Sequence, residues 1–255
     1  MHPWHPKCFF VCDKPRGVLC LITNGLLFSD GLMRQVVEEA AYVRVSLEGA
    51  MPLDYATYKG TTRKQQQKVI ENIQAAIQER NDTGSTCEIS IKFSVSQSLR
   101  GIDHYVAGIQ LGKQLGVDGV QFKALRHEPE ELMFAEKMAE QELLKKAIYE
   151  TDSSDLVRYW IKPADHVPQC VLNPLHVVVD HNGDCYICCY YYYRGDEHKL
   201  GNILSDDFDS FWYGKEHQGK VKAIDPEKCR LVDCKFFSHD DVAKWAFDKN
   251  RTCWL

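Results

Sequence analysis

Short apolar runs alternate with longer amphipathic segments through the first half of this chain, and this alternation most limits the folds it can adopt. Such a pattern is typical of right-handed βαβ units, which build a parallel sheet or a barrel. The sequence therefore predicts an α/β fold. The expected strands cover residues 18–22, 42–47, 88–95 and 118–125, and the expected helices cover 32–41, 61–80, 102–116 and a stretch containing Leu132, Phe134, Met138 and Leu143.

The composition changes near Pro163 and Pro168, and beyond that point the chain is rich in loops. Residues 175–189 contain an apolar run, an Asn-Gly pair and a second run that ends in cysteines. An Asn-Gly pair favours the tight turn of a β-hairpin. We therefore predict two domains, residues 1–162 and residues 163–255, with a hairpin in the small second domain.

The cysteines are concentrated in that second region. The chain has 11 cysteines, an odd number, and seven of them follow residue 169. Disulfides rarely persist inside cells, and buried structural cysteines would be scattered evenly. Cys170 precedes the hairpin, Cys188 closes its second strand, and Cys229 and Cys234 lie in a later loop. Thiolates that converge from three segments indicate a zinc or an iron-sulfur site.

Charge and hydropathy exclude several kinds of partner. Lys and Arg total 31 against 36 Asp and Glu, a formal charge of -5, and no basic block occurs, so we expect no nucleic-acid partner. No apolar run approaches the roughly 18 to 20 residues that span a bilayer, so we expect no membrane span. The first ten residues lack the apolar segment of a signal peptide. The sequence therefore predicts a cytoplasmic protein.

The segments LITNG, RVSLEGA with DYATYKG, ISIKFSV and LGVDGVQFK follow one another along the chain. In the tail, twelve residues separate Cys170 from Gly183 and four separate Gly183 from Cys188, and a Leu-Gly-Asn-Ile segment and a Trp-containing helix follow. In this order, the segments resemble the central strands of the radical S-adenosylmethionine (radical SAM) superfamily. The tail resembles the SPASM/Twitch extension of that superfamily, in which a cysteine, a glycine and a second cysteine follow one another at set spacings.

The resemblance implies a partial (β/α) barrel of four parallel strands, joined to a small loop-rich domain that binds an auxiliary [4Fe-4S] cluster. Its ligands would be Cys170, Cys188, Cys229 and Cys234, with Cys189 as the fallback. Four protein ligands would close the coordination and suit the cluster to electron transfer or structure. The last two ligands of the family are commonly CxxC, whereas four residues separate Cys229 from Cys234 here.

A structural zinc module is the alternative interpretation of the same cysteines. Cys185 and Cys188 form a CxxC pair that could join Cys229 and Cys234 in a tetrahedral thiolate site. That set omits Cys170 and leaves the match to the family spacing unexplained.

The resemblance also implies a SAM site that lacks part of its machinery. Family members carry a CxxxCxxC loop that holds a catalytic [4Fe-4S] cluster, whereas here Cys8 and Cys12 have the first spacing and Pro15 stands at the third position. We therefore expect the chain to begin near the second helix of the barrel, without its first two strands. By itself it would not cleave SAM, unless another polypeptide or upstream coding sequence supplies the missing part.

Residues at the carboxyl ends of the remaining strands would still face SAM, because ligands of such barrels lie at those ends. The cofactor-binding residues implied in this way are Asn24, Ser46, Glu48 and Lys92. A complete relative would be a SAM-dependent radical oxidoreductase or modifying enzyme whose substrate is a peptide, a sugar or a cofactor precursor. Its electron donor would be a protein such as a flavodoxin or ferredoxin. A non-catalytic zinc or iron-sulfur binding module is the alternative function.

Overall fold

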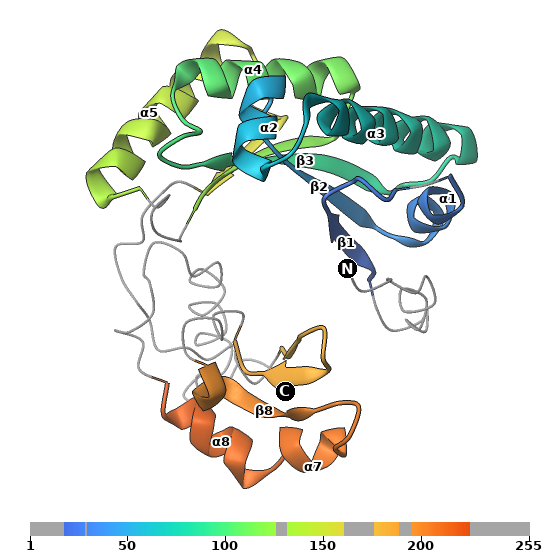
Figure 1. Ribbon diagram of the computed structural model, residues 1–255, viewed down its shortest axis with the longest axis vertical. Helices are drawn as coiled ribbons and strands as arrows, with labels where there is room; N and C mark the ends of the chain where they lie inside the picture. Colours follow the sequence, from blue (N-terminus) through green and yellow to red (C-terminus); the bar gives the residue numbers. More distant parts are fainter. Residues whose placement is uncertain (1–17, 29, 126–131, 161–175, 189–194, 225–255) are drawn as a thin grey trace, which may run out of the picture. The chain divides into compact units, whose positions relative to one another are not determined.

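The computed structural model describes residues 18–28, 30–125, 132–160, 176–188 and 195–224. The chain divides into two compact units, Met1–Lys162 and Pro163–Leu255. The first unit contains a five-stranded parallel sheet, and the second contains a three-stranded antiparallel sheet (Figure 1). No helix within the described ranges is both long and apolar enough to cross a membrane.

The strands of the first unit lie in sequence order, β1-β2-β3-β4-β5, and every neighbouring pair is parallel. The predicted α/β fold is thereby confirmed. The strands are β1 Cys20–Thr23, β2 Tyr42–Glu48, β3 Glu88–Val95, β4 Gly119–Ala124 and β5 Val157–Trp160. The helices are α1 Asp30–Glu39, α2 Pro52–Lys59, α3 Arg63–Thr83, α4 Ile102–Leu115 and α5 Phe134–Glu150.

The sequence predicted four strands for this sheet, and that number was wrong. The additional strand, β5, pairs with β4. Its four residues, VRYW, directly follow a polar segment and are too few to establish an alternating pattern. The helix α2 was also not predicted, because residues 52–59 carry no clear apolar stripe.

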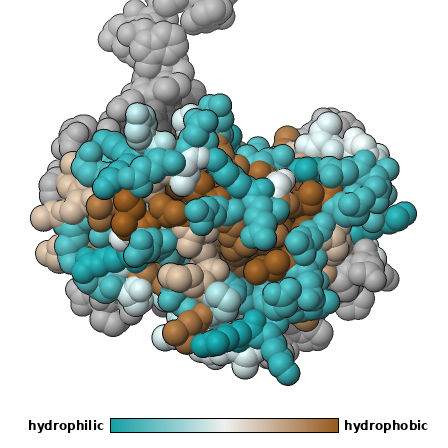
Figure 2. Space-filling view, turned by 90° about the horizontal axis from the view of Figure 1, so that it is seen from above, coloured by the Kyte–Doolittle hydropathy of each residue, from teal (hydrophilic) through white to brown (hydrophobic). Residues whose placement is uncertain are grey.

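Side chains alternate between the two faces of the sheet, and the faces differ in chemistry. Val43, Ile91 and Phe122 are fully buried in the hydrophobic core that the strands form with the helices. The long helices α3, α4 and α5 lie on one side of the sheet (Figure 1). Their outward surface is mostly hydrophilic, with apolar atoms showing between them (Figure 2). The residues that alternate with the core positions on β2, β3 and β4 are polar: Arg44, Ser46, Ser90, Lys92, Ser94, Gln121 and Lys123.

Local sequence signals determine where the longest helix, α3, begins and how closely another helix, α4, approaches the sheet. The Thr62 side chain caps α3 by accepting a hydrogen bond from the Gln65 backbone N–H at 3.3 Å. In α4, a methyl group on Gly112 would lie 2.2 Å from Cγ2 of Val120. The absence of a side chain at that glycine therefore lets α4 approach β4.

The second unit is built on the predicted hairpin, which the structure confirms. Its strands β6 Val178–Val179 and β7 Asp184–Tyr186 are antiparallel. Gly183 has a φ of +84°, and the Asp180 carboxylate accepts hydrogen bonds from the backbone N–H groups of Asn182 and Asp184. β7 ends at Tyr186, whereas the sequence placed Cys188 at the end of that strand.

Short elements complete this unit around a small core of Cys185, Ile187 and Leu200. They are the 3-10 helix η3 Gly195–His198, β8 Lys199–Asn202, α7 Phe208–Trp212 and α8 Lys215–Lys222. The Trp-containing helix expected after β8 is thus two helices, separated at Tyr213 and Gly214. β8 pairs with β7 in antiparallel orientation and covers the predicted Leu-Gly-Asn segment.

Candidate functional site

A buried ion pair joins the carboxyl ends of β2 and β3. Nζ of Lys92 lies 2.7 Å from Oε2 of Glu48 and donates a second hydrogen bond, of 2.9 Å, to Oγ of Ser94. The Ser94 hydroxyl donates in turn to the same carboxylate oxygen of Glu48. Glu48 and Lys92 are each only 9% exposed. The structure therefore brings two of the four predicted SAM-site residues into direct contact.

The backbone at Glu48 departs from regular strand geometry. The pairing of β2 with β3 shifts between Ser46 and Glu48, and Glu48 has a φ of +71°, which few non-glycine residues adopt. The Gly49 N–H donates to the Leu47 carbonyl at 2.9 Å, which closes a three-residue turn around Glu48. A side chain at Gly49 would lie 2.8 Å from the backbone nitrogen of Tyr55. The SLEG sequence thus ends the strand and directs the chain into α2.

A second ammonium group accompanies this ion pair. Nζ of Lys59, at the end of α2, lies 3.9 Å from Oε1 of Glu48. Burial lowers the pKa of Lys59, and Lys92 lowers it further, whereas the Glu48 carboxylate opposes the shift. Two lysines therefore share the Glu48 carboxylate. An anionic group of a ligand, such as a carboxylate, would balance the surplus positive charge. The sequence did not single out Lys59, because helix α2 itself was not predicted.

The other two predicted SAM-site residues differ in their surroundings. Ser46 is the β2 partner of Lys92 in the register, is half-buried, and makes no side-chain hydrogen bond within the described residues. Its hydroxyl is thus available to a ligand. The Asn24 carboxamide oxygen accepts a hydrogen bond from the Leu26 backbone N–H at 3.1 Å. In the described part of the chain, Asn24 serves a local turn and has no bond to the Glu48–Lys92 pair.

A buried histidine, His104, contacts the backbone of Ser94. Nε2 of His104 is 2.9 Å from the Ser94 carbonyl, so this nitrogen carries the hydrogen and donates it. Burial lowers the pKa of His104, and the bond to Ser94 only partly opposes that shift. The imidazole is therefore held neutral, and it anchors α4 to the strand that carries Lys92.

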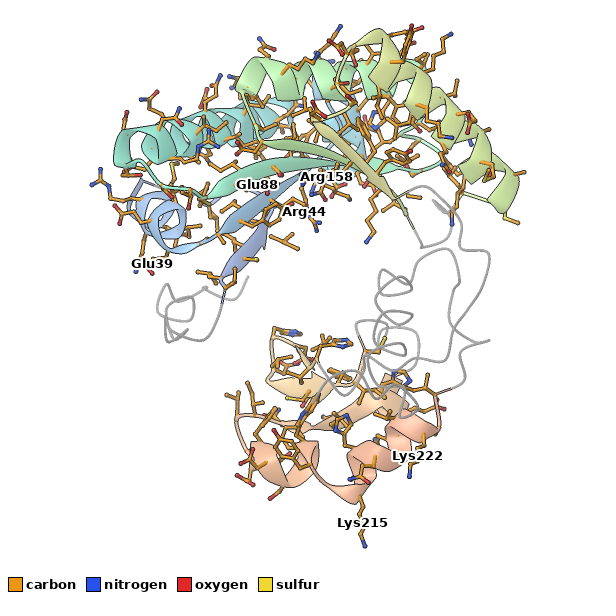
Figure 3. The ribbon with its side chains drawn as sticks, turned by 180° about the vertical axis from the view of Figure 1, so that it is seen from behind. Glu39, Arg44, Glu88, Arg158, Lys215 and Lys222 are labelled. Atoms are coloured by element: carbon orange, nitrogen blue, oxygen red, sulfur yellow. The ribbon has the colours of Figure 1, made fainter. Side chains whose placement is uncertain are left out.

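Polar groups continue along the sheet toward the amino ends of the strands. Nη1 of Arg44 donates to Oε1 of Gln121 at 3.1 Å, and Nη1 of Arg158 lies 3.3 Å from Oε1 of Glu88. Figure 3 labels Arg44, Glu88 and Arg158, which come from β2, β3 and β5. Both contacts join side chains of strands that are separated by one intervening strand, so polar groups are paired across this end of the sheet.

The predicted cluster ligands are described only in part. Cys188 is half-buried and packs against the small core of the second unit, whereas Cys170, Cys229 and Cys234 lie outside the described residues, as does Cys189. Within the described ranges, no three His, Cys, Asp or Glu side chains are grouped as a metal site would require. The donor chemistry nevertheless fits an iron-sulfur cluster, because thiolates are its usual ligands and residues 170–235 contain six cysteines.

Cys185, which the zinc alternative requires, is fully buried in the core of the second unit. Burial raises the pKa of its thiol, so the protonated form is favoured there. Cys185 thus packs in the core of the second unit.

Comparison with known proteins agrees with these features. Residues 170–235 match the SPASM family, an iron-sulfur cluster-binding domain. The structure is similar to Streptococcus suis SuiB bound to S-adenosylmethionine, with a TM-score of 0.63, 11% identity and coverage of 86% of this chain and 53% of SuiB. The complex of SuiB with the precursor peptide SuiA gives the same TM-score and coverage at 10% identity. No curated protein matches the sequence.

A further match is anSMEcpe with bound AdoMet, with a TM-score of 0.57, 17% identity and coverage of 84% of this chain and 64% of that protein. The chain thus spans about half the length of SuiB and less than two thirds of anSMEcpe. The family match confirms the resemblance of the tail to a SPASM extension, and the structural matches confirm the shared fold. Residues 170–235 thus match an iron-sulfur cluster-binding domain, and the structure shares the fold of proteins solved with bound SAM.

Proposed function

We propose that this chain forms part of a SAM-dependent radical enzyme that modifies a peptide. The observation that carries the proposal is the group formed by Ser46, Glu48 and Lys92 at the carboxyl ends of two parallel strands. Ligands of α/β barrels bind at those ends. A peptide is favoured over a sugar or a cofactor precursor because SuiB, which shares the fold, is bound to a precursor peptide in one of its structures.

In this proposal the charged group binds the amino-acid part of SAM. Lys59 and Lys92 together carry one positive charge more than Glu48 neutralises, which suits the carboxylate of the ligand. Ser46 offers a hydroxyl that can accept or donate one hydrogen bond. Glu48 and Ser94 hold the Lys92 ammonium in place, so little side-chain entropy remains to be lost on binding.

The second unit would supply the redox chemistry through ligands Cys170, Cys188, Cys229 and Cys234. A [4Fe-4S] cluster with four thiolate ligands transfers single electrons when it is bound. A flavodoxin or ferredoxin would be a suitable electron donor. Since such clusters and free thiols persist under reducing conditions, we propose a cytoplasmic location.

The test is an anaerobic titration of the complete, cluster-loaded chain with SAM, measured by isothermal titration calorimetry. We expect saturable binding, and we expect Ser46→Ala and Lys59→Met each to weaken it by roughly tenfold, the amount that one hydrogen bond to a charged group contributes. Lys145→Met is the matched control, because Lys145 is exposed on α5 and pairs with Glu142, far from Glu48 in the sequence. Absence of binding, or variants that bind as tightly as the control, would contradict the SAM site.

A further inference from the structure

The face of the five-stranded sheet that is turned away from the hydrophobic core carries an excess of positive charge. These strands contain two carboxylates, those of Glu48 and Glu88. Each of β2, β3, β4 and β5 places one cationic side chain on this face: Arg44, Lys92, Lys123 and Arg158. The chain as a whole has a formal charge of -5, so this face differs in sign from the rest. An anionic partner would complement it.

The two arginines of this face reach toward each other across the sheet. Nη1 of Arg44, on β2, donates to Oε1 of Gln121, on β4, at 3.1 Å. Nη1 of Arg158, on β5, lies 3.3 Å from Oε1 of Glu88, on β3. Each side chain passes over one intervening strand, so both guanidinium groups extend over the central strands β3 and β4 (Figure 3).

Arg44 keeps donors that no group of the protein uses. Its Nε is buried and has no hydrogen-bond partner, and its Nη2 has none among the described residues. In that part of the chain Arg44 also pairs with no carboxylate, whereas Lys92 and Arg158 do. A buried donor without an acceptor is unfavourable, so an acceptor from a ligand is expected there.

The free donors of Arg44 lie on one edge of its guanidinium plane. Gln121 holds the opposite corner through Nη1, and Gln121 is itself held because its Nε2 donates to the Tyr42 hydroxyl at 2.5 Å. The orientation of the guanidinium is therefore fixed before a ligand arrives. The parallel N–H groups of Nε and Nη2 match the two oxygens of a carboxylate.

We propose that the Nε and Nη2 edge of Arg44 binds an Asp or Glu side chain of the peptide substrate. The inference rests on the proposed function and names the substrate class, an acidic peptide. Arg44 precedes Ser46 by two residues on β2, so both side chains lie on one face of the strand, about 7 Å apart along it. A peptide carboxylate at Arg44 would thus lie beside the proposed SAM site. One carboxylate also balances the single charge of Arg44, whereas phosphate carries more.

The test follows the Nε–H signal of Arg44 by nuclear magnetic resonance in the complete chain labelled with nitrogen-15. The probe is an alanine peptide that contains one glutamate and has both ends capped, so that the glutamate side chain is its only carboxylate. We expect this peptide to shift the Nε–H signal until the site is saturated. The same peptide with glutamine in place of glutamate should cause no saturable shift. This comparison needs no substituted protein and does not depend on the folding of a variant.

Substitution then assigns the signal and measures the contribution of the guanidinium edge. Arg44→Lys keeps the charge but removes the two parallel donors, and it is expected to lose the signal and to bind the glutamate peptide roughly tenfold more weakly. Arg34→Lys is the matched control, because Arg34 is an exposed arginine of α1 that pairs with Glu79. It should bind the peptide as the unchanged chain does.

The outcomes separate this inference from the proposed function. If SAM binds but the glutamate and glutamine peptides behave alike, or if Arg44→Lys binds the peptide as tightly as Arg34→Lys, the acidic substrate class is overturned and the SAM site remains. Inorganic phosphate that shifts the Nε–H signal as strongly as the glutamate peptide would indicate a general anion site and would also overturn it. Failure to bind either SAM or the peptide would overturn both proposals.

Discussion

At the scale of single residues, the charged group at the ends of β2 and β3 is the most demanding feature of the first unit. Removing Glu48 and Lys92 from water is costly, and their mutual contact, the Ser94 hydroxyl and the nearby Lys59 ammonium offset that cost. The sequence could indicate these residues one by one as polar groups on strand ends. It could not predict their contact, because that depends on the register of β2 against β3 and on the turn at Glu48.

Lys92→Met is expected to destabilise the first unit by about 3–5 kcal/mol, because it leaves the Glu48 carboxylate buried without its main partner. Urea denaturation, with hydrogen exchange of the β2 and β3 amides as the probe, measures the change. Adding Glu48→Gln should restore part of the loss. Lys145→Met removes an exposed ion pair and should cost less than about 1 kcal/mol, so equal losses for the two lysines would refute this account of the buried pair.

His104 makes the stability of the first unit depend on pH. Its pKa is lowered by burial from 6.5, despite the Ser94 bond and the nearby charges of Asp54 and Glu140. Below pH 6.5 the unfolded chain takes up a proton that the folded imidazole refuses, so stability is lost as the pH falls through the lowered pKa. Between pH 6.5 and the lowered pKa, the free energy of unfolding falls by at most about 1.4 kcal/mol per pH unit, and above pH 6.5 the contribution of His104 to the slope vanishes.

The measurement is the free energy of unfolding between neutral pH and about two units below the ordinary histidine pKa. We expect His104→Gln to flatten the slope, because glutamine does not titrate. The exposed His181→Gln should leave the slope unchanged. An unchanged slope in the His104 variant would show that other groups cause the pH dependence.

At the scale of elements, the apolar pattern and the helix caps were sufficient to predict the long segments that have one apolar face. β2, β3, α3 and α4 agree with the predicted ranges within a few residues. β5 and α2 were missed because four strand residues and an eight-residue helix carry too little periodicity. The expected single helix after β8 is divided at Gly214, where a side chain would lie 2.5 Å from the Ser210 carbonyl oxygen.

The contact of α4 with the sheet yields a prediction at this scale. Gly112→Ala should destabilise the first unit by about 1–3 kcal/mol, because the new methyl group would overlap Cγ2 of Val120. Gly31→Ala in α1 is the control, since no atom lies within 4 Å of the added carbon. It should stabilise by about 0.5–1 kcal/mol. Thermal unfolding would contradict the packing account if both changes had the same sign.

At the scale of the whole molecule, two units carry two kinds of chemistry. The first places buried charge at the ends of parallel strands, and the second concentrates thiols in residues that match an iron-sulfur domain. The cysteine spacing was readable from sequence because ligand motifs are local in the chain. The role of Lys59 was not readable in this way, because it depends on burial and on contacts made by a folded helix.

The most direct test of the central claim is the iron and acid-labile sulfide content of the complete chain after anaerobic reconstitution. We predict about four iron atoms and four sulfides per chain, and visible absorption that bleaches on reduction. Cys188→Ala should lose the iron, the sulfide and the absorption. Cys20→Ala changes an exposed thiol outside the matched segment and should leave the content unchanged. A colourless protein that holds zinc and no sulfide, or a Cys188 variant that loads as the Cys20 variant does, would contradict the account.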